Sequence, residues 1–347
     1  MRVFKDVNLA NYHTFGVSVQ SAWFAEVSRL TDLLTLLRSG VHPTLVLGEG
    51  SNVLFTRDFP GLVIKNAMSG KSLMPDPTDP HRVVVEVASG ENWHAFVRWT
   101  LEQNLGGLEN LSLIPGTTGA APVQNIGAYG VELADVLQEL EVLELHTGKL
   151  LRLKAADCGF GYRTSRFKGE WKDQFLITRL FFALSSQQHQ LHTAYGDIES
   201  HLGGIPPEQR TPQQVSEAVM AIRRSKLPDP AQLGNAGSFF KNPETDRDTR
   251  DALLKKYPDL VSFPLRENRF KVPAAWLLDK AGWKGKSIGR VACHTSQPLV
   301  IVNTGGASGL EILDFAVTVA ADIREKFGFR LEPEVNIFPP GAWPEGD

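Results

Sequence analysis

The pattern of apolar and polar positions over residues 1–70 indicates a small α/β unit. Leucines of the segment 31–37 can form one apolar helix face, with Thr31 as N-cap and Gly40 as the stop. Two apolar runs at 44–47 and 53–55 are typical of short buried strands. The glycine-containing segment between them, 48–52, is expected to be a tight loop.

From residue 71 onward the pattern becomes richer in strands. A helix is expected at 92–104, where Trp93, Phe96, Val97 and Leu101 share one face. A second helix is expected at 212–226, with proline at its first helical position. The expected strands are 82–88, a hairpin of 137–145 with 149–153, and 174–184.

Prolines at 228 and 230 mark a boundary, and a third α/β region follows it. We expect a helix at 273–281 closed by Gly282, and a helix from a capping box at Ser308 to Phe327. Strands are expected at 298–303 and 333–338. The chain therefore divides into three expected regions, namely 1–70, 71–226 and 227–329.

Composition and charge narrow the possible functions. The 347 residues are 42% hydrophobic and carry a net charge of −3, so there is no basic surface typical of nucleic-acid or membrane binding. Two cysteines do not make a disulfide scaffold and fit a reducing compartment. The N-terminus lacks the apolar segment of a signal peptide, and apolar runs such as 299–302 are only strand-sized. We therefore expect a cytoplasmic protein.

The first loop with candidate chemistry runs from Gly48 to Val53. Its glycines, serine and asparagine can present several N–H groups to a phosphate. Val53 stands where a dinucleotide-binding fingerprint has its third glycine, and Pro60 follows too soon for a full helix. A plain hairpin turn is the competing interpretation.

A longer stretch of small residues, 115–130, is a stronger candidate for a ligand site. Few bulky side chains separate its main-chain amides from a planar or phosphorylated ligand. It could also be a flexible linker, but Ile114, Val123, Ile126 and Tyr129 give it apolar anchors. We therefore favour a ligand cradle.

Three further segments combine polar groups in unusual settings. Arg163 lies in a cationic turn beside Tyr162, Ser238 lies between a small-residue turn and two phenylalanines, and Glu334 begins an apolar strand. A buried carboxylate of this kind needs a cationic partner such as arginine. His189 and His192 have a spacing that metal sites can use, but no cluster of cysteines or carboxylates accompanies them, so we expect no metal.

Taken together, these motifs make the chain resemble the UDP-N-acetylenolpyruvoylglucosamine reductase family over nearly its whole length. The resemblance includes 14–16, 48–52, 115–130, 161–163, 235–242 and 333–335, in the family's order. It implies an α+β protein with a two-lobed FAD-binding fold of the vanillyl-alcohol-oxidase type and a C-terminal α/β substrate-binding domain. The lobes would be 1–70 and 71–226, with 330–347 packing back on the first, and 227–329 would be the substrate-binding domain.

The resemblance also implies a mechanism with noncovalent FAD and with NADPH as co-substrate. Arg163 and Glu334 would stabilise an enediolate of the substrate, and Ser238 would donate a proton. The residues matching FAD contacts are Gly48, Glu49, Gly50, Ser51, Asn52, Val53, Pro115, Gly116, Thr117, Gly119, Ala120, Asn125, Ile126 and Gly127. Those matching substrate contacts are Tyr162, Tyr195, Lys226, Asn242, Lys284 and Gln297.

Two features qualify this resemblance. The segment around Tyr195 is typical of the family branch with an extra tyrosine-bearing loop, and Asn336 stands where the family often has arginine.

An FAD-linked oxidase on the same scaffold is the main alternative, although the stretch 115–130 contains no histidine or cysteine to tether a flavin. A sugar-nucleotide binding module is a more distant one. We expect a monomer that binds only small molecules.

Overall fold

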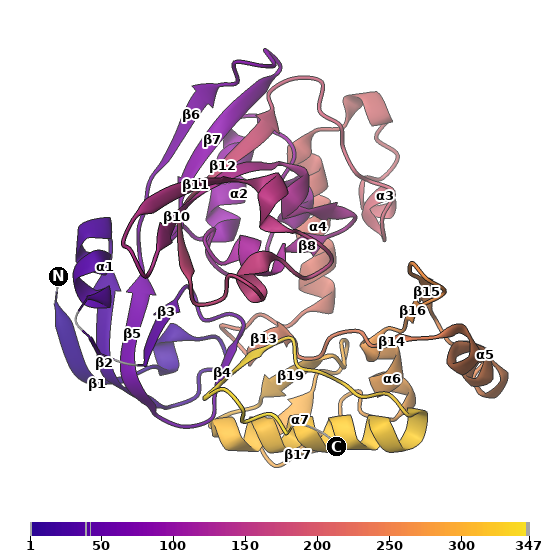
Figure 1. The fold of residues 1–347 in the computed structure, drawn as a ribbon. Helices are drawn as coiled ribbons and strands as arrows, with labels where there is room; N and C mark the ends of the chain where they lie inside the picture. Colours follow the sequence, from indigo (N-terminus) through magenta and orange to yellow (C-terminus); the bar gives the residue numbers. More distant parts are fainter. Residues whose placement is uncertain (1, 39, 42, 345–347) are drawn as a thin grey trace. The chain divides into compact units, whose positions relative to one another are not determined.

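The computed structural model describes residues 2–38, 40–41 and 43–344, so the last part of the expected C-terminal segment, 345–347, lies outside the described residues. Two compact units are present (Figure 1). Unit 1 comprises 1–5, 23–49 and 61–225, and unit 2 comprises 6–22, 50–60 and 226–347. The last boundary falls within one residue of the expected one after residue 226, while the division into three domains stays a prediction.

A five-stranded antiparallel sheet forms the larger part of unit 1, in the order β11-β10-β12-β7-β6 (Figure 1). Its β10–β11 pair is the hairpin expected from the sequence. The strands are β6 (Lys71–Pro75), β7 (Arg82–Ala88), β10 (Leu137–Glu144), β11 (Leu150–Lys154) and β12 (Phe175–Ser185). Helix α2 (Trp93–Glu102) begins at the N-cap Asn92 and buries Trp93 and Phe96 in the same core as Phe182 of β12.

A second sheet has four strands in the order β1-β2-β5-β3. They are β1 (Val3–Asn8), β2 (Gln20–Val27), β3 (Thr44–Leu47) and β5 (Phe59–Asn66). Strands β3 and β5 are parallel, and helix α1 (Leu30–Leu37) buries Leu33 and Leu36 in the core of this sheet. The α1 and β3 segments match the expectation, whereas β1, β2 and β5 were not expected.

Helix α4 (Pro212–Lys226) spans the expected segment, and all of it except Lys226 belongs to unit 1. Its buried residues Val215, Val219 and Ile222 share a small core with α3 (Ile198–His201). The chain also forms short 3-10 helices: η1 (Ala10–Tyr12), η2 (Glu109–Leu111), η3 (Ala121–Gln124), η4 (Leu133–Asp135), η5 (Ala155–Cys158), η6 (Arg166–Lys168) and η7 (Pro207–Gln209).

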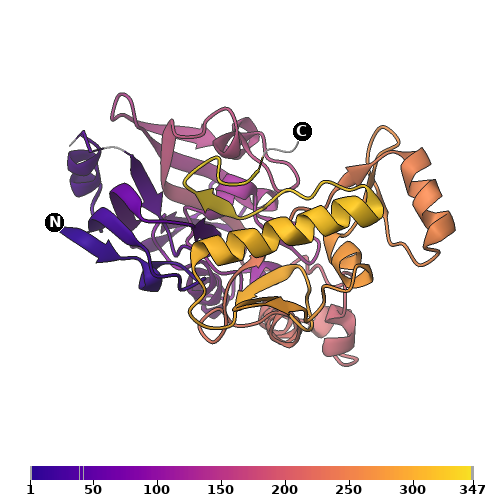
Figure 2. The same ribbon diagram turned by 90° about the horizontal axis from the view of Figure 1, so that it is seen from below.

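Unit 2 contains a four-stranded sheet in the order β13-β19-β18-β17, and Figure 2 shows the long helix α7 running beside it. The elements are β13 (Gly234–Ser238), β17 (Ser287–Ile288), β18 (Val291–Cys293), β19 (Val300–Asn303), α6 (Ala274–Lys280) and α7 (Gly309–Phe327). The expected capping box is present, because Ser308 and Glu311 bond each other's backbone N–H groups. Helix α6 ends at Lys280, just before Gly282, as predicted.

Smaller pairings hold the remaining parts of unit 2. Strand β14 (Glu244–Thr245) pairs with β16 (Phe270–Lys271), and β16 also pairs with β15 (Phe263–Pro264). Helix α5 (Arg247–Lys256) follows β14 in the chain and precedes β15. Strand β20 (Asn336–Phe338) pairs in parallel with β4 (Val53–Phe55). The last strand thus begins three residues later than expected, because Pro333 pairs with Phe240 in an isolated bridge and Glu334 donates to Phe239 instead.

No helix within the described residues is both long and apolar enough to cross a membrane.

Candidate cofactor and active site

The second glycine-rich loop is an ordered part of unit 1, held against the start of α2. The amides of Thr118 and Gly119 donate to Glu91 O and Ser89 O, each at 2.9 Å, and Trp93 N donates to Gly116 O at 2.9 Å. A Cβ on Gly119 would lie 2.5 Å from the Ser89 Cβ, so only glycine fits there. The flexible-linker interpretation is therefore wrong.

Asn125 fixes the middle of this loop. Its backbone is left-handed, with φ 44°, and its side chain is 1% exposed. The Nδ2 group donates to Glu132 at 2.7 Å and to Gly161 O at 3.2 Å, while Oδ1 accepts from Ala134 N at 3.0 Å. The hairpin that follows pairs β8 (Gly127–Ala128) with β9 (Val131–Glu132). The Asn125 side chain is thus used to tie the loop to the Gly161 turn.

In unit 1 the first glycine-rich loop lies directly against the second. A Cβ on Gly48 would lie 2.7 Å from the Thr117 Oγ1, so the absence of a side chain permits the contact. The Glu49 carboxylate accepts from Gly116 N at 2.9 Å and from Asn92 Nδ2. Lys65 Nζ donates to Gly48 O. Burial lowers the pKa of Lys65, and the charge of Glu49 opposes this shift.

Both loops retain amide groups for a ligand. Within the described residues, neither the Ser51 amide nor the Thr117 amide donates to another part of the chain. Thr117 is only 4% exposed, and a buried amide without a partner is costly. Amides of this kind in small-residue loops suit phosphate or carbonyl oxygens, so the loops fit a phosphorylated cofactor such as FAD.

In unit 2 the first loop continues beside the segment around residue 14 and the C-terminal strand. Gly50 has φ 64°, and its carbonyl accepts from Thr14 N at 3.1 Å. Asn52 donates through Nδ2 to Glu334 O at 3.3 Å, and its own carbonyl accepts from the Asn336 amide and the Asn336 side chain, each at 3.1 Å. Asn336 therefore fastens β20 to the loop.

Unit 2 also brings Ser238 and Glu334 onto neighbouring segments. Glu334 N donates to Phe239 O at 2.8 Å, and Lys241 N donates to Glu332 O at 2.9 Å. Ser238 ends β13 beside Val300, after a bulge that contains Gly237 with φ 71°. Among the described residues its hydroxyl has no hydrogen-bond partner, which leaves the hydroxyl available to a ligand.

Arg163 lies in a tight turn of unit 1 beside the second loop. Gly161 and Thr164 exchange two backbone hydrogen bonds of 3.1 and 3.2 Å around it, and Arg163 itself is left-handed with φ 54°. Left-handed backbone costs a non-glycine residue about 1 kcal/mol or more, and such residues concentrate at functional sites. Ser165 donates to Val123 O at 2.7 Å, so the turn is bonded directly to the loop.

The two tyrosines expected near the substrate are among the most exposed large side chains of unit 1. Tyr162 is 57% exposed and Tyr195 is 60% exposed. Tyr195 meets the ring of Tyr129 edge-on, with 6.3 Å between the ring centres, at the end of the second loop. Unit 1 therefore gathers Arg163, Tyr162, Tyr195 and the second loop.

Unit 2 holds the other four residues expected to bind substrate. The Asn242 Oδ1 accepts from Ala274 N at 2.9 Å, so it caps the start of α6. The buried Oε1 of Gln297 has no hydrogen-bond partner among the described residues, which suits an N–H donor of a ligand. Lys284 and Lys226 are exposed.

Comparison with known proteins decides the family. Residues 22–154 match the family model of an FAD binding domain, and 229–338 match that of the UDP-N-acetylenolpyruvoylglucosamine reductase C-terminal domain. A Burkholderia multivorans UDP-N-acetylenolpyruvoylglucosamine reductase is 47% identical, with 95% of each chain covered. A Flavobacterium johnsoniae reductase of the same name is 43% identical over 97% of this chain and all of its own. The chain belongs to the UDP-N-acetylenolpyruvoylglucosamine reductase family.

The fold agrees with a solved structure that carries the family's name. The Thermus caldophilus UDP-N-acetylenolpyruvylglucosamine reductase has a TM-score of 0.67 at 24% identity, covering 98% of this chain and all of its own. The expected fold class, an FAD-binding part followed by a C-terminal reductase domain, is therefore confirmed.

Two residues that support the candidate site, Arg223 and Asn92, were not found as such from the sequence. Arg223 of α4 donates through Nε to Leu113 O at 3.2 Å. Burial lowers the pKa of Arg223, and the nearby charge of Arg163 lowers it further, while the interaction with Tyr129 opposes this shift. Asn92 was recognisable as a helix start, but its bond to Glu49 spans 43 positions and leaves no local signal.

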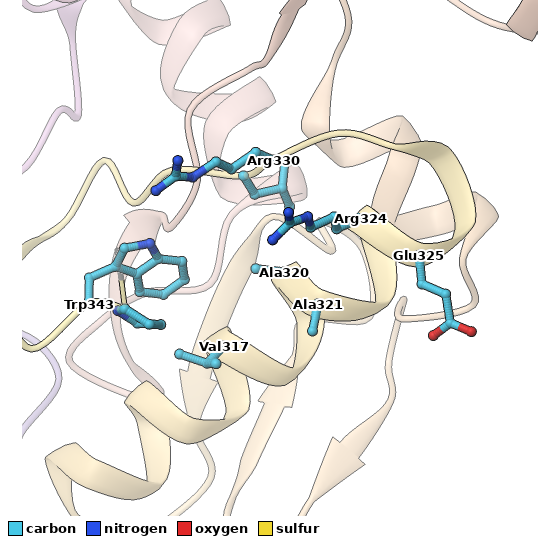
Figure 3. A pocket seen from close by; sticks show the side chains of 9 residues that line it. Val317, Ala320, Ala321, Arg324, Glu325, Arg330 and Trp343 are labelled. Atoms are coloured by element: carbon cyan, nitrogen blue, oxygen red, sulfur yellow. The ribbon is translucent and has the colours of Figure 1, made fainter. Parts of the chain in front are cut away.

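A separate pocket of about 460 Å³ opens in unit 2 over α7 (Figure 3). Arg324 and Arg330 lie on one side of it and Trp343 on another, while Glu325 points away. The pocket contains none of the residues expected in the reductase site.

Proposed function

We propose that this protein reduces the enolpyruvyl group of UDP-N-acetylglucosamine enolpyruvate to give UDP-N-acetylmuramate, a step in the synthesis of peptidoglycan precursors, with NADPH as the hydride donor. The family membership and the FAD-binding match over 22–154 support the reaction class. FAD, when bound, would accept hydride from NADPH and pass it to the terminal vinyl carbon of the substrate.

Arg163 is the group proposed to stabilise negative charge on the substrate. Hydride addition to the vinyl carbon spreads charge onto the neighbouring carboxylate as an enediolate. A guanidinium is planar and permanently charged, so it can donate two hydrogen bonds to that group. The strained turn around Arg163 is bonded to the cofactor loop through Ser165, which supports a fixed position for this cation.

Ser238 is proposed to donate the proton to the second carbon. A serine hydroxyl is a weak acid near neutral pH, so a cation must stabilise the alkoxide it leaves. The ammonium of Lys241 lies 2.8 Å from the Glu332 carboxylate, which neutralises part of its charge. We propose Lys226 and Lys241 as the two cations that could supply the stabilising charge.

Glu334 is proposed to share the site of charge development with Arg163. Its backbone is fixed on both sides, because its amide donates to Phe239 O and its carbonyl accepts from Asn52. That framework links the Glu334 segment to both the Ser238 strand and the first loop. The side chain would act as a protonated donor or would orient Arg163.

The remaining assignments concern binding. Tyr195, Lys226, Asn242, Lys284 and Gln297 are proposed to hold the diphosphate and sugar of the substrate. One pocket would receive NADPH and the UDP-sugar in turn. The FAD would be noncovalent, since residues 115–130 contain no histidine or cysteine. We further propose a monomeric cytoplasmic enzyme of the family branch with the extra tyrosine-bearing loop.

The observation that carries the proposal is the pair of packed glycine-rich loops with the Arg163 turn bonded to them, in a chain 47% identical to a named reductase. The test is product analysis. Purified protein with FAD, NADPH and the enolpyruvyl-UDP-sugar should consume one NADPH for each sugar, whose mass rises by two hydrogens. Oxygen consumption with small alcohols, and no change in the UDP-sugar, would indicate an oxidase instead.

A further inference from the structure

Glu49 is the one acidic side chain of the first glycine-rich loop, and its position raises an electrostatic problem. A carboxylate next to the diphosphate of FAD would repel it. The Glu49 side chain is instead occupied by donors of the chain itself. It accepts from the Gly116 amide at 2.9 Å and from the Asn92 side chain.

These two bonds connect three parts of unit 1. Gly116 belongs to the second glycine-rich loop, and Asn92 caps α2 through a 2.7 Å bond from Ala95 N. Glu49 therefore joins the first loop to the second loop and to the helix that supports it. Because Gly116 is bonded to Glu49, the next amide along the chain, that of buried Thr117, keeps a fixed direction and remains unpaired for a ligand.

Lys65 offsets the charge of this carboxylate. Its ammonium donates to Gly48 O, directly before Glu49 in the chain, and it is attracted by Glu49 and Glu26. This cation offsets part of the negative charge of Glu49 beside the loops. A dianionic diphosphate can then approach the amides without meeting an uncompensated carboxylate.

We infer that Glu49 is a positioning residue for FAD: it does not contact the cofactor but holds the two glycine-rich loops at the spacing that binds it. This inference rests on the proposed function only for the identity of the cofactor. It changes the expected role of Glu49, which the family resemblance places among the FAD contacts.

The experiment measures FAD dissociation constants of apoprotein by flavin fluorescence, together with the melting temperature of each apoprotein. Glu49→Gln removes the charge and replaces one acceptor oxygen by a donor, so we expect FAD affinity to fall about ten- to a hundredfold. The apoprotein should melt within about 2 °C of the parent, because one part-exposed side chain is altered. Glu102→Gln, at the exposed end of α2, is the matched control and should bind FAD normally.

Two further variants test the spacing of the two loops where Gly48 meets Thr117. Gly48→Ala leaves Glu49 intact but pushes its new methyl group against Thr117, so FAD affinity should fall. Adding Thr117→Ala removes the obstructing Oγ1 and should restore much of that affinity. At saturating FAD, Glu49→Gln should keep the parent's flavin absorption spectrum, since no cofactor contact is lost.

The possible failures are distinguishable. If the parent protein bound no FAD, the proposed function itself would fail. If the parent bound FAD and Glu49→Gln bound it within twofold as tightly, the positioning role would be wrong. A shifted flavin spectrum in Glu49→Gln would show direct contact, and an apoprotein that melts many degrees lower would show a general folding role. Either result overturns the inference.

Discussion

Replacing Ser238 by alanine should separate the two halves of the catalytic cycle. The hydroxyl has no hydrogen-bond partner among the described residues, so its removal strands no buried polar group. Strand β13 is held to β19 by backbone pairing, which alanine preserves. Folding and FAD content should therefore be unchanged, and the melting temperature should stay within about 1 °C of the parent's, as for a substitution of about ±0.5 kcal/mol or less.

The expected size of the effect distinguishes a proton donor from a binding contact. Loss of one ordinary hydrogen bond, about 0.5–1.5 kcal/mol, would slow a step roughly two- to tenfold. Loss of a positioned acid costs about a hundredfold to ten-thousandfold, or roughly 2.7–5.4 kcal/mol. We expect Ser238→Ala to slow flavin reoxidation by the UDP-sugar within the larger range. Flavin reduction by NADPH needs no proton from Ser238 and should keep its rate.

Stopped-flow absorbance of the flavin reads the two half-reactions separately. Ser238→Cys should retain some reoxidation activity, since a thiol can still donate a proton, and Ser296→Ala, at an exposed serine of unit 2, is the control. Equal slowing of both half-reactions by Ser238→Ala would show that Ser238 binds or packs, and the acid assignment would then be wrong.

Three further predictions concern the cofactor, the shared pocket and unit 2. Acid or heat denaturation should release FAD into the supernatant, and yellow colour that stays with the precipitate would contradict noncovalent binding. Lys226→Met should raise the KM for NADPH and for the UDP-sugar together in steady-state assays with parallel initial-rate lines, whereas intersecting lines would indicate a ternary complex. Bonds from Ser308 and Arg290 lower the pKa of Glu311 from 4.5 to about 2. The ionised Glu311 should therefore stabilise unit 2 above about pH 4.5, and this stabilisation should be lost as the pH falls toward 2. In thermal melts, Glu311→Gln should abolish that part of the pH dependence. An unchanged pH profile in the variant would refute this role of Glu311.

The parts of the fold that the sequence predicts well are those with strong local signals. The α4 segment begins with proline at its first helical position, and α7 begins with a capping box, so both helix starts were identified. Strands β1 and β2 carry no clear alternation, because their positions depend on partners distant in the sequence. Glu334 was placed inside a strand, but its amide bonds to Phe239, a partner that no local pattern reveals.

In the candidate site, too, the sequence predicted the features that have strong local signals and missed those that depend on distant partners. Glycines and small residues marked both loops, since only they admit close backbone contact, and the structure places Gly48 and Gly119 where a Cβ would collide. The sequence did not predict which side chains hold the two loops together. Asn125 and Glu49 are predicted FAD contacts, and the structure adds that their side chains bond to Gly161, Glu132, Gly116 and Asn92. Sequence spacing shows which residues are unusual but not which partner each one meets.

The most direct test of the central claim is an anaerobic titration of the FAD-loaded protein followed at the flavin absorbance band. NADPH should bleach the flavin completely, and subsequent addition of the enolpyruvyl-UDP-sugar should restore the oxidised spectrum with one equivalent of sugar for each flavin. Bleaching without recovery on addition of the UDP-sugar would contradict the account, as would a flavin that NADPH does not reduce.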